Sequence, residues 1–414
     1  MIGVKTGIGG GLFDQAVVSF GNFALSLMLA RALPVPAYGG FVTILSFVLF
    51  FNLIHQAAVT YPLSVAAAGA SASQCRVLLG KAALASVLGS LVLSAPLSIA
   101  MASLGRLDLL LITFLAMLAW QMQETIRRGL LAQARFSRTI AQDGVRYLGP
   151  LIVIFLLNRP LAIKDVFLLI LGASWAAVLP QLRLLGWPHF TNVRDFCRQQ
   201  WIDWTMASPV VGASLLAAFS TQWYLWILAW HHDTTGTAAL AALANVAALI
   251  SPIMLGIENI LVPEVARLRG QLPFGDMLRH LRGRSLLCGV LILPICTAVL
   301  LFPTECLRLL YGHGTIYADY PQDLRLLVLA YVSYLANAIL GATLRGYRAG
   351  RAAFLMQAYP AAFGLIIGGW ITITWGLNGA CVAALLTGVL RAAFGLRYLF
   401  ALRLRHETSA ATAI

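Results

Sequence analysis

The stretch GGFVTILSFVLFFNLIHQAAVTYPLSV, residues 39–65, decides the fold of this chain. It contains no Asp, Glu, Lys or Arg, and it exceeds the roughly 20 mainly apolar residues with which a helix crosses the hydrocarbon of a bilayer. Similar runs fill the rest of the chain, of which 60% is hydrophobic and only 11% charged. A soluble domain, whose surface must meet water, does not have such a composition. We therefore predict a membrane protein with many spans.

The predicted fold class is an all-α polytopic membrane protein, with about twelve transmembrane helices in two pseudo-symmetric six-helix halves. The N-terminal half is residues 1–187, and residues 205–414 form the C-terminal half with a short tail. Between them, residues 188–204 place aromatic side chains opposite charged ones at helical spacing, which indicates a cytoplasmic interfacial linker helix. The predicted spans are 12–33, 39–65, 79–101, 107–130, 141–157 and 164–184, then 205–229, 237–263, 284–302, 322–345, 353–374 and 378–400.

Two pairs of short stretches match between the halves in the same order. They are TIRRG (125–129) with ATLRG (342–346), and YPLSVA (61–66) with VPEVA (262–266). The first match pairs Arg128 with Arg345. A duplicated six-helix unit is a transporter architecture, with the substrate path between the repeats.

Basic residues divide unevenly between the two ends of the predicted spans. Of 29 Lys and Arg residues, 23 fall on the side of both termini. Because basic residues near helix ends are held in the cytoplasm, both termini are predicted to be cytoplasmic. The net charge is +14, and the basic residues lie singly or in pairs at the ends of the predicted helices. This distribution favours membrane lipids as partners and argues against nucleic acid. The six residues on the other side are Arg31, Arg106, Arg159, Lys164, Arg308 and Arg325.

Enzyme and metal signatures are missing from the sequence. The six cysteines are scattered without a CxxC or metal-ligand spacing, so we expect no disulfide, metal or cofactor. There is no Walker phosphate loop, GxSxG or HExxH. We predict that the protein is not an enzyme.

Three stretches resemble the polysaccharide and lipid-linked oligosaccharide flippases of the multidrug, oligosaccharidyl-lipid and polysaccharide exporter superfamily. The resemblance, which rests on order and spacing, covers nearly the whole chain. The stretches are LARALPVPAYGGFVTILSFVLFF (29–51), TTGTAALAALANVAALISPIMLGIENILVPEVARL (234–268) and LRLLYGHGTIYADYPQDLRLLVLAYVSYLANAILGATLRGYRAGR (307–351).

The resemblance implies a multi-pass flippase of the bacterial inner membrane. It would move an undecaprenyl-diphosphate-linked oligosaccharide to the outer leaflet by alternating access, for surface or exopolysaccharide assembly. The lipid-linked oligosaccharide is then the substrate, and a polysaccharide polymerase and glycosyltransferases are candidate partners. Two other functions stay open: a cation-coupled antiporter of drugs or small molecules on the same scaffold, and a membrane scaffold for polysaccharide synthesis that transports nothing.

Polar residues within the spans are the candidate substrate and lumen residues. Charged groups at the bilayer centre are costly and usually face a bundle interior or water. The resemblance implies that helices 1, 2, 7 and 8 line a central cavity, with Glu258 as the strongest candidate for transport. Each candidate also has a structural alternative. Asn22 and Asn259 could form hydrogen bonds between helices, Asp14 could cap a helix or pair with an arginine, and His55 could be a packing residue. The candidates are Asp14, Asn22, His55, Gln56, Glu258, Asn259 and Asn337.

A second group lies near the predicted cytoplasmic mouth and is a candidate for binding the substrate headgroup. The planar guanidinium of arginine recognises phosphate oxygens through several donors. Anchoring by positive charge is the alternative, and Glu124 lies four residues before Arg128, where the two can pair. Lipid II flippases carry arginines in their cavity on helices 1, 2 and 8, whereas this chain has His55 and Glu258, which argues against a peptidoglycan precursor. The headgroup candidates are Arg128, Arg345, Glu124 and Arg146, with Gln121, Gln123 and Arg127 nearby.

Overall fold

The computed structural model shows helices and no strand in the part of the chain that it describes. The chain forms two compact units, Met1–Ala218 and Phe219–Ile414. The predicted linker helix at 188–204 lies outside the described residues. The described residues are 2–68, 70–157, 159–186, 212, 215–216, 218–220, 222–269 and 271–411.

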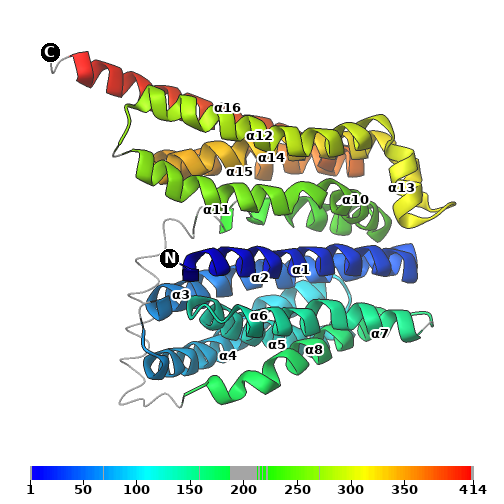
Figure 1. Ribbon diagram of the computed structural model, residues 1–414. Coiled ribbons are helices and arrows are strands. Elements are labelled where there is room, and N and C mark those ends of the chain that lie inside the picture. The colour runs from blue at the N-terminus through cyan, green and yellow to red at the C-terminus, as the bar shows by residue number, and fades with distance from the viewer. Residues whose placement is uncertain are drawn as a thin grey trace. The chain divides into compact units, whose positions relative to one another are not determined.

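The first unit contains six apolar helical runs, some built from several segments (Figure 1). They agree in order and approximate bounds with the six predicted spans. The segments are α1 (Ile2–Ala32), α2 (Val35–His55), the π segment η1 (Gln56–Thr60), α3 (Tyr61–Ala68), α4 (Ala72–Ser103), the 3-10 turn η2 (Leu107–Leu109), α5 (Leu110–Ala132), α6 (Phe136–Asp143), the π segment η3 (Gly144–Leu148), α7 (Gly149–Leu157), α8 (Ile163–Val178) and the 3-10 segment η4 (Leu179–Leu184).

Local signals set the starts of these helices. Pro34 precedes α2 in an extended conformation that cannot continue α1. At the start of α4, the Ser71 hydroxyl accepts from the backbone N–H of Gln74. The side-chain oxygen of Gln74 accepts from the backbone N–H of Ser71 at 2.9 Å. This capping box satisfies two backbone donors that would otherwise lack partners.

The helix α5 is central to the first unit, because it packs against α4 and α8. Its side chains Met122, Ile126 and Leu130 are buried together with Val178 of α8. Lipid is as apolar as these side chains, so close packing rather than transfer from water stabilises them in a membrane. The polar residues of α5 are thereby held inside the bundle.

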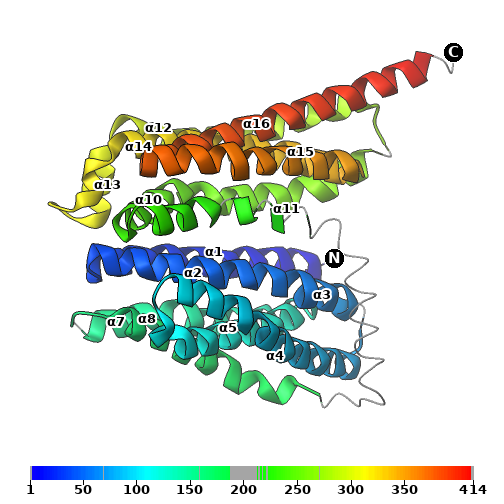
Figure 2. The same ribbon diagram turned by 180° about the vertical axis from the view of Figure 1, so that it is seen from behind.

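The second unit begins with a helix that is described only in part before residue 222. Figures 1 and 2 show α14 and α15 alongside α16, and α14 and α16 pack closely together. The further segments are α10 (Thr234–Ala247), the 3-10 turn η5 (Ala248–Ile250), α11 (Ser251–Leu268), α12 (Phe274–Leu301), α13 (Pro303–Tyr311), the 3-10 turn η6 (Ile316–Asp319), α14 (Pro321–Gly346), α15 (Gly350–Phe363), the π segment η7 (Gly364–Gly368) and α16 (Gly369–Ala411).

Two sharp breaks shape the second unit. The helix α16 contains Gly376 at φ 59° and ψ −133°, a conformation that glycine adopts without steric penalty. The run Gly350–Leu404 is therefore two successive spans that meet at Gly376, as the predicted spans 353–374 and 378–400 require. The end of α12 and α13 are bent by 95° at Phe302, and Figure 1 shows α13 crossing the end of the unit.

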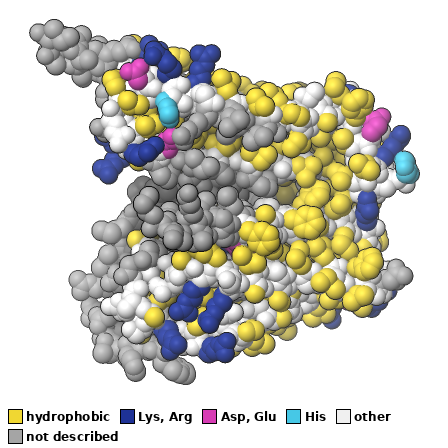
Figure 3. Space-filling view, viewed as in Figure 1, with side chains coloured by type: hydrophobic (Ala, Val, Ile, Leu, Met, Phe, Trp, Pro, Cys, Tyr) yellow, Lys and Arg dark blue, Asp and Glu magenta, His cyan; other side chains and the backbone are white. Residues whose placement is uncertain are grey.

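Eight described helical runs are long and apolar enough to cross a membrane, or nine if the bent pair is one span. These counts treat Gly350–Leu404 as one run and include only described residues. On the face shown in Figure 3, hydrophobic side chains cover the middle of each unit and basic side chains lie toward the helix ends. The protein is an all-α polytopic membrane protein.

The two units share local features at matching places in the chain. The fifth run of the first unit contains the π segment η3, and the run that begins at Gly350 contains the π segment η7. The loops before these runs each hold a non-glycine residue with positive φ, Ala134 (53°) and Arg348 (61°). Ala134 and Arg348 lie 214 positions apart, whereas the starts of η3 and η7 lie 220 apart, so these features fix no residue-by-residue alignment, and the pairing of Arg128 with Arg345 stays a prediction.

Candidate functional site

The centre of the candidate site is Arg127 on α5, which lies inside the first unit. Its Nη2 lies 2.5 Å from Oδ2 of Asp14 on α1, and its Nε lies 2.5 Å from Oδ2 of Asp143 at the end of α6. Glu124, one turn earlier on α5, lies 3.6 Å from Nη1. Arg127 and both aspartates are buried. One guanidinium thus joins three helices through charge-assisted hydrogen bonds.

Amide side chains surround this charged centre. The side-chain amide of Gln123 donates to Oδ1 of Asp143 at 2.9 Å. The side-chain amide of Gln142 donates to the backbone carbonyl of Gln123 at 3.2 Å. Oδ1 of Asp14 and the side-chain oxygens of Gln123 and Gln142 are buried and have no partner in the described part of the chain. Buried acceptors without partners are unfavourable, so a donor such as water would stabilise these oxygens.

The two aspartates interact with each other as well as with Arg127. Both accept a hydrogen bond from the same Arg127 guanidinium through their Oδ2 atoms. Two carboxylates at one buried position disfavour full ionisation of both, and Arg127 offsets part of this repulsion. A single guanidinium therefore faces two buried carboxylates from different helices.

Arg146 lies on the π segment η3 and has a different environment from Arg127. It is only 2% exposed, and its guanidinium carbon lies 4.5 Å from the ring centroid of Trp120 and 5.1 Å from that of Tyr147. Its Nε has no hydrogen-bond partner, and no carboxylate within 4 Å pairs with it among the described residues. Stacking on aromatic rings offsets only part of the cost of burying a cation. Arg146 is therefore a buried cation that an anion would stabilise.

The predicted pair of Glu124 and Arg128 forms, with Nε of Arg128 2.6 Å from Oε1 of Glu124. The Arg128 side chain is 34% exposed, so it lies at the edge of the cluster. This is the helical pairing that the sequence spacing allows, and it also places Glu124 between two arginines. Nε of Arg128 is thus bonded to Glu124, whereas Nε of Arg146 has no partner among the described residues.

His55 takes part in a separate polar contact at the end of α2. Its Nε2 lies 2.9 Å from the Ser86 hydroxyl of α4 and 3.2 Å from the Thr125 hydroxyl of α5. His55 is buried, and these contacts all lie within the first unit. The geometry is that of a hydrogen bond between packed helices, as membrane bundles use. Gln56, the next residue, is half-buried and begins the π segment η1.

The other sequence candidates are dispersed. Asn22 is exposed on α1, and Arg345 is exposed in the last turn of α14. In the second unit, the Asn337 amide is buried and donates to the Gly388 carbonyl at 3.2 Å. Glu258 and Asn259 lie on α11, but their side chains are outside the described part of the structure.

The sequence candidates did not include four buried charged residues, Asp143, Glu264, Asp323 and Arg391. Asp143 lies at the very start of the predicted span 141–157, whereas the helix begins at Phe136. Arg391 lies inside α16, is 9% exposed, and has no partner for Nε and Nη2 in the described residues. A single arginine inside an apolar run is a signal that the sequence offered, because charged groups in spans are rare.

No group of three or more metal-ligating side chains that could hold a metal ion is found among the residues that the structure describes. The first-unit cluster joins two buried carboxylates to the Arg127 guanidinium, and the Arg146 guanidinium has no carboxylate within 4 Å among the described residues.

Comparison with solved structures identifies the fold. The chain matches the lipid II flippase MurJ in an inward closed conformation with a TM-score of 0.72 at 11% identity, covering 97% of this chain and 91% of that chain. It also matches an inward-facing multidrug resistance transporter of the MATE family, with a TM-score of 0.70 at 16% identity over 97% and 96% of the two chains. A transporter of the MOP superfamily from Pyrococcus furiosus gives 0.64 at 14% identity over 98% and 95%.

These matches confirm the predicted fold, which is that of MOP superfamily transporters. A flippase and a multidrug transporter match it about equally well, so the fold fits both kinds of protein. No protein-family model matches the sequence, and no curated protein matches it significantly.

Proposed function

We propose that the protein is a flippase that moves an undecaprenyl-diphosphate-linked oligosaccharide across the bacterial inner membrane by alternating access. The observation that carries the proposal is Arg146, a buried guanidinium with no carboxylate partner among the described residues, in a fold shared with a lipid II flippase. A planar guanidinium is well suited to a diphosphate, which offers several acceptor oxygens. The lipid tail stays in the bilayer while the charged headgroup crosses.

The position of Arg146 suggests how a headgroup reaches it. Trp120 and Tyr147 cover its guanidinium, so binding requires these rings to move. Arg146 lies in a π segment, and such segments are frequent at functional sites in helices. We infer that the span α6 to α7 changes conformation at η3 when the headgroup binds.

The buried aspartates supply a way to couple this movement to a proton. When one of Asp14 and Asp143 takes up a proton, the net charge around Arg127 changes, and the contacts between α1, α5 and α6 change with it. The same pair supports the second candidate function, a cation-coupled antiporter of small molecules. Glu258 and Asn259 on α11, and Arg128 and Arg345, remain further candidates for ion and headgroup binding.

The proposal is tested by complementation of a deletion strain that has no paralogue. Loss of the protein is expected to leave lipid-linked glycan on the inner leaflet and to abolish a surface polysaccharide. Normal surface polymer in the deletion strain would refute the proposed substrate, and hypersensitivity to drugs would favour the antiporter. If the protein only organises polysaccharide synthesis, substitutions in the buried cluster should be silent.

The variant Arg146→Gln tests the site itself. It removes an unpaired buried charge, so the variant is expected to accumulate at least as well as the wild type while transport falls. Arg138→Gln is the matched control, because Arg138 is exposed on α6, which belongs to the same helical run as Arg146. Full complementation by Arg146→Gln at equal expression would remove Arg146 from the transport pathway.

A further inference from the structure

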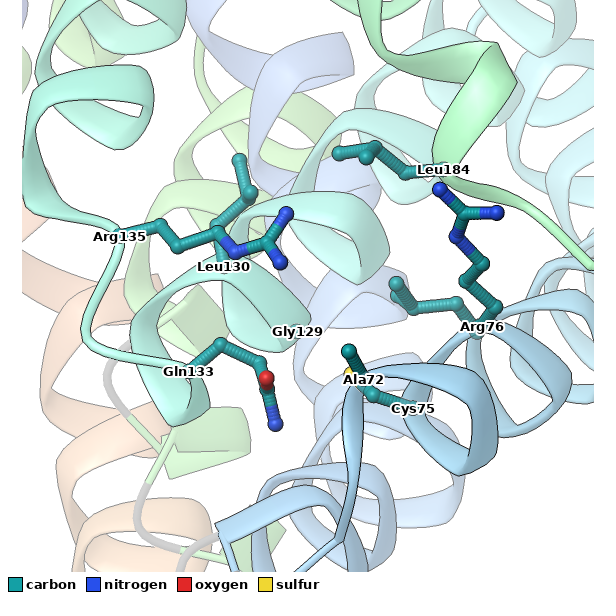
Figure 4. Close-up of a pocket in the computed structure, with 9 residues that line it drawn as sticks. Ala72, Cys75, Arg76, Gly129, Leu130, Gln133, Arg135 and Leu184 are labelled. Atoms are coloured by element: carbon teal, nitrogen blue, oxygen red, sulfur yellow. The ribbon is translucent and has the colours of Figure 1, made fainter.

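A small pocket lies at one end of the first unit, where α4 begins and α5 ends. Figure 4 shows Arg135 and Arg76 entering it from opposite sides. Its volume is about 300 Å³, part of which is open to solvent. It lies at the helix ends, whereas Arg127 lies one to two turns further inside α5. The lining residues are Ala72, Cys75, Arg76, Leu79, Gly129, Leu130, Gln133, Arg135 and Leu184.

The two arginines of the pocket have no acidic partner among the described residues. Arg127 and Arg128, which lie close by in the sequence, both pair with carboxylates. Arg76 and Arg135 form neither an ion pair nor a side-chain hydrogen bond in the described part of the chain. The Arg135 guanidinium is close enough to act electrostatically on the Cys75 thiol in the pocket lining. Among the described residues, the pocket therefore has a positive potential that no acidic group neutralises.

The remaining lining keeps the pocket in place and makes it amphipathic. The Gln133 amide donates to the carbonyls of Ala67 and Ala70, both at 3.2 Å, which ties the end of α5 to the end of α3. The Gly186 N–H donates to the Arg76 carbonyl at 2.9 Å, which fixes the chain after η4 against α4. Leu79, Leu130 and Leu184 supply apolar walls, so a charged group and a hydrocarbon group can be held together.

We propose that this pocket binds the phosphate of an anionic phospholipid from the adjacent leaflet. Basic pockets between transmembrane helices are suited to lipid headgroups. The apolar lining and the position at the helix ends favour a lipid over free phosphate, because glycerol and acyl carbons can contact the leucines and the outer surface of α4. That helix carries exposed apolar side chains further along, Leu88, Leu91 and Val92. The site is independent of the proposed flippase activity and of its substrate.

The experiment measures lipid retention by the full-length protein. Wild type is reconstituted in nanodiscs of phosphatidylcholine with phosphatidylglycerol, released into detergent, and examined by native mass spectrometry for bound phosphatidylglycerol. The variant Arg76→Gln with Arg135→Gln is compared with the control Arg138→Gln with Arg183→Gln. The control removes the same charge from exposed arginines outside the pocket lining.

Phosphatidylglycerol is expected to bind the wild type and the control, and to bind the pocket variant more weakly. The loss is about fivefold for one arginine and about thirtyfold for both, if each contributes as a basic residue near anionic lipid does. Equal retention by the pocket and control variants would overturn the proposal. So would displacement of the lipid by millimolar inorganic phosphate alone, which would assign the pocket to free phosphate. The melting temperature of the pocket variant in phosphatidylcholine alone shows whether this variant folds. A milder single variant, Arg135→Lys, keeps the positive charge and should retain most of the phosphatidylglycerol binding.

Discussion

Replacing Arg127 by methionine tests whether the buried ion pairs hold the helices of the first unit together. Arg127 links Asp14 of α1 and Asp143 of α6 to α5, with both N–O distances at 2.5 Å. Methionine keeps the approximate volume but leaves two buried carboxylates facing each other. We expect a large loss of stability, because a charge without its partner is far less favourable than a buried pair.

The expected magnitude follows from the burial of the partners. The side chains of Asp14 and Asp143 are 3% and 0% exposed, so water cannot replace the arginine. Removing one partner of a buried pair lowers the free energy of unfolding by about 3–5 kcal/mol. Gln123 still donates to Asp143, and one carboxyl can take up a proton, so the loss should stay within this range. The triple variant with Asp14→Asn and Asp143→Asn contains no buried charge at these positions and should recover most of the loss.

The assay is unfolding of the purified protein in mixed micelles by titration with sodium dodecyl sulfate, followed by tryptophan fluorescence. Arg128→Met is the matched control on the same helix. Its side chain is 34% exposed and pairs only with Glu124 among the described residues, so the expected loss is below about 1 kcal/mol. If Arg127→Met loses no more stability than this control, the buried pairs do not hold α1 and α6 to α5. A triple variant no more stable than Arg127→Met would refute the charge argument as well.

Three further predictions concern other parts of the chain. His55→Leu should lower the free energy of unfolding by about 1 kcal/mol, because the buried hydroxyl groups of Ser86 and Thr125 lose their shared partner. His55→Gln should lose less stability. Equal stability of the wild type and His55→Leu in the same titration would contradict this. Gly346→Ala should lower it by about 1–3 kcal/mol, because the new methyl group would lie 2.7 Å from Val265 Cβ, whereas Gly350→Ala has open space and should be neutral. A similar melting temperature for the two glycine variants would argue against close packing of α14 on α11. In a cysteine-free background, Asn192→Cys should resist membrane-impermeant thiol reagents in intact cells, since the basic residues place 188–204 in the cytoplasm. External labelling would overturn that topology.

Much of the fold was predictable because membrane spans are encoded locally. Apolar length alone places the spans, and the predicted runs 39–65, 107–130 and 322–345 agree with Val35–Ala67, Leu107–Ala132 and Pro321–Gly346 to within a few residues. Lipid requires each backbone polar group to bond within its own helix, so few alternatives to long helices exist. The break at Gly376 was predictable for the same reason, since one run cannot cross twice without a turn.

The site was less predictable, because pairing between helices depends on rotation and depth as well as on sequence. The sequence showed that Glu124 and Arg128 can pair, since both lie on one helix at a fixed spacing. It did not show that Arg127, the neighbouring residue, faces Asp14, which lies 113 positions earlier. It also placed Asp143 at a span boundary, whereas five additional residues of helix, 136–140, put it inside the bundle.

Sequence by itself determined that this chain is helical, crosses the membrane repeatedly and carries a duplicated plan, because these properties depend on composition and on spacing along one helix. Only the tertiary structure decided which polar residues meet: Arg127 with two aspartates, His55 with Ser86 and Thr125, and Arg146 with the rings of Trp120 and Tyr147. The physical reason is that a charged side chain in an apolar run must face some partner, but the partner is chosen by how whole helices pack. That choice depends on contacts distributed over many residues, none of which marks the pair in the sequence.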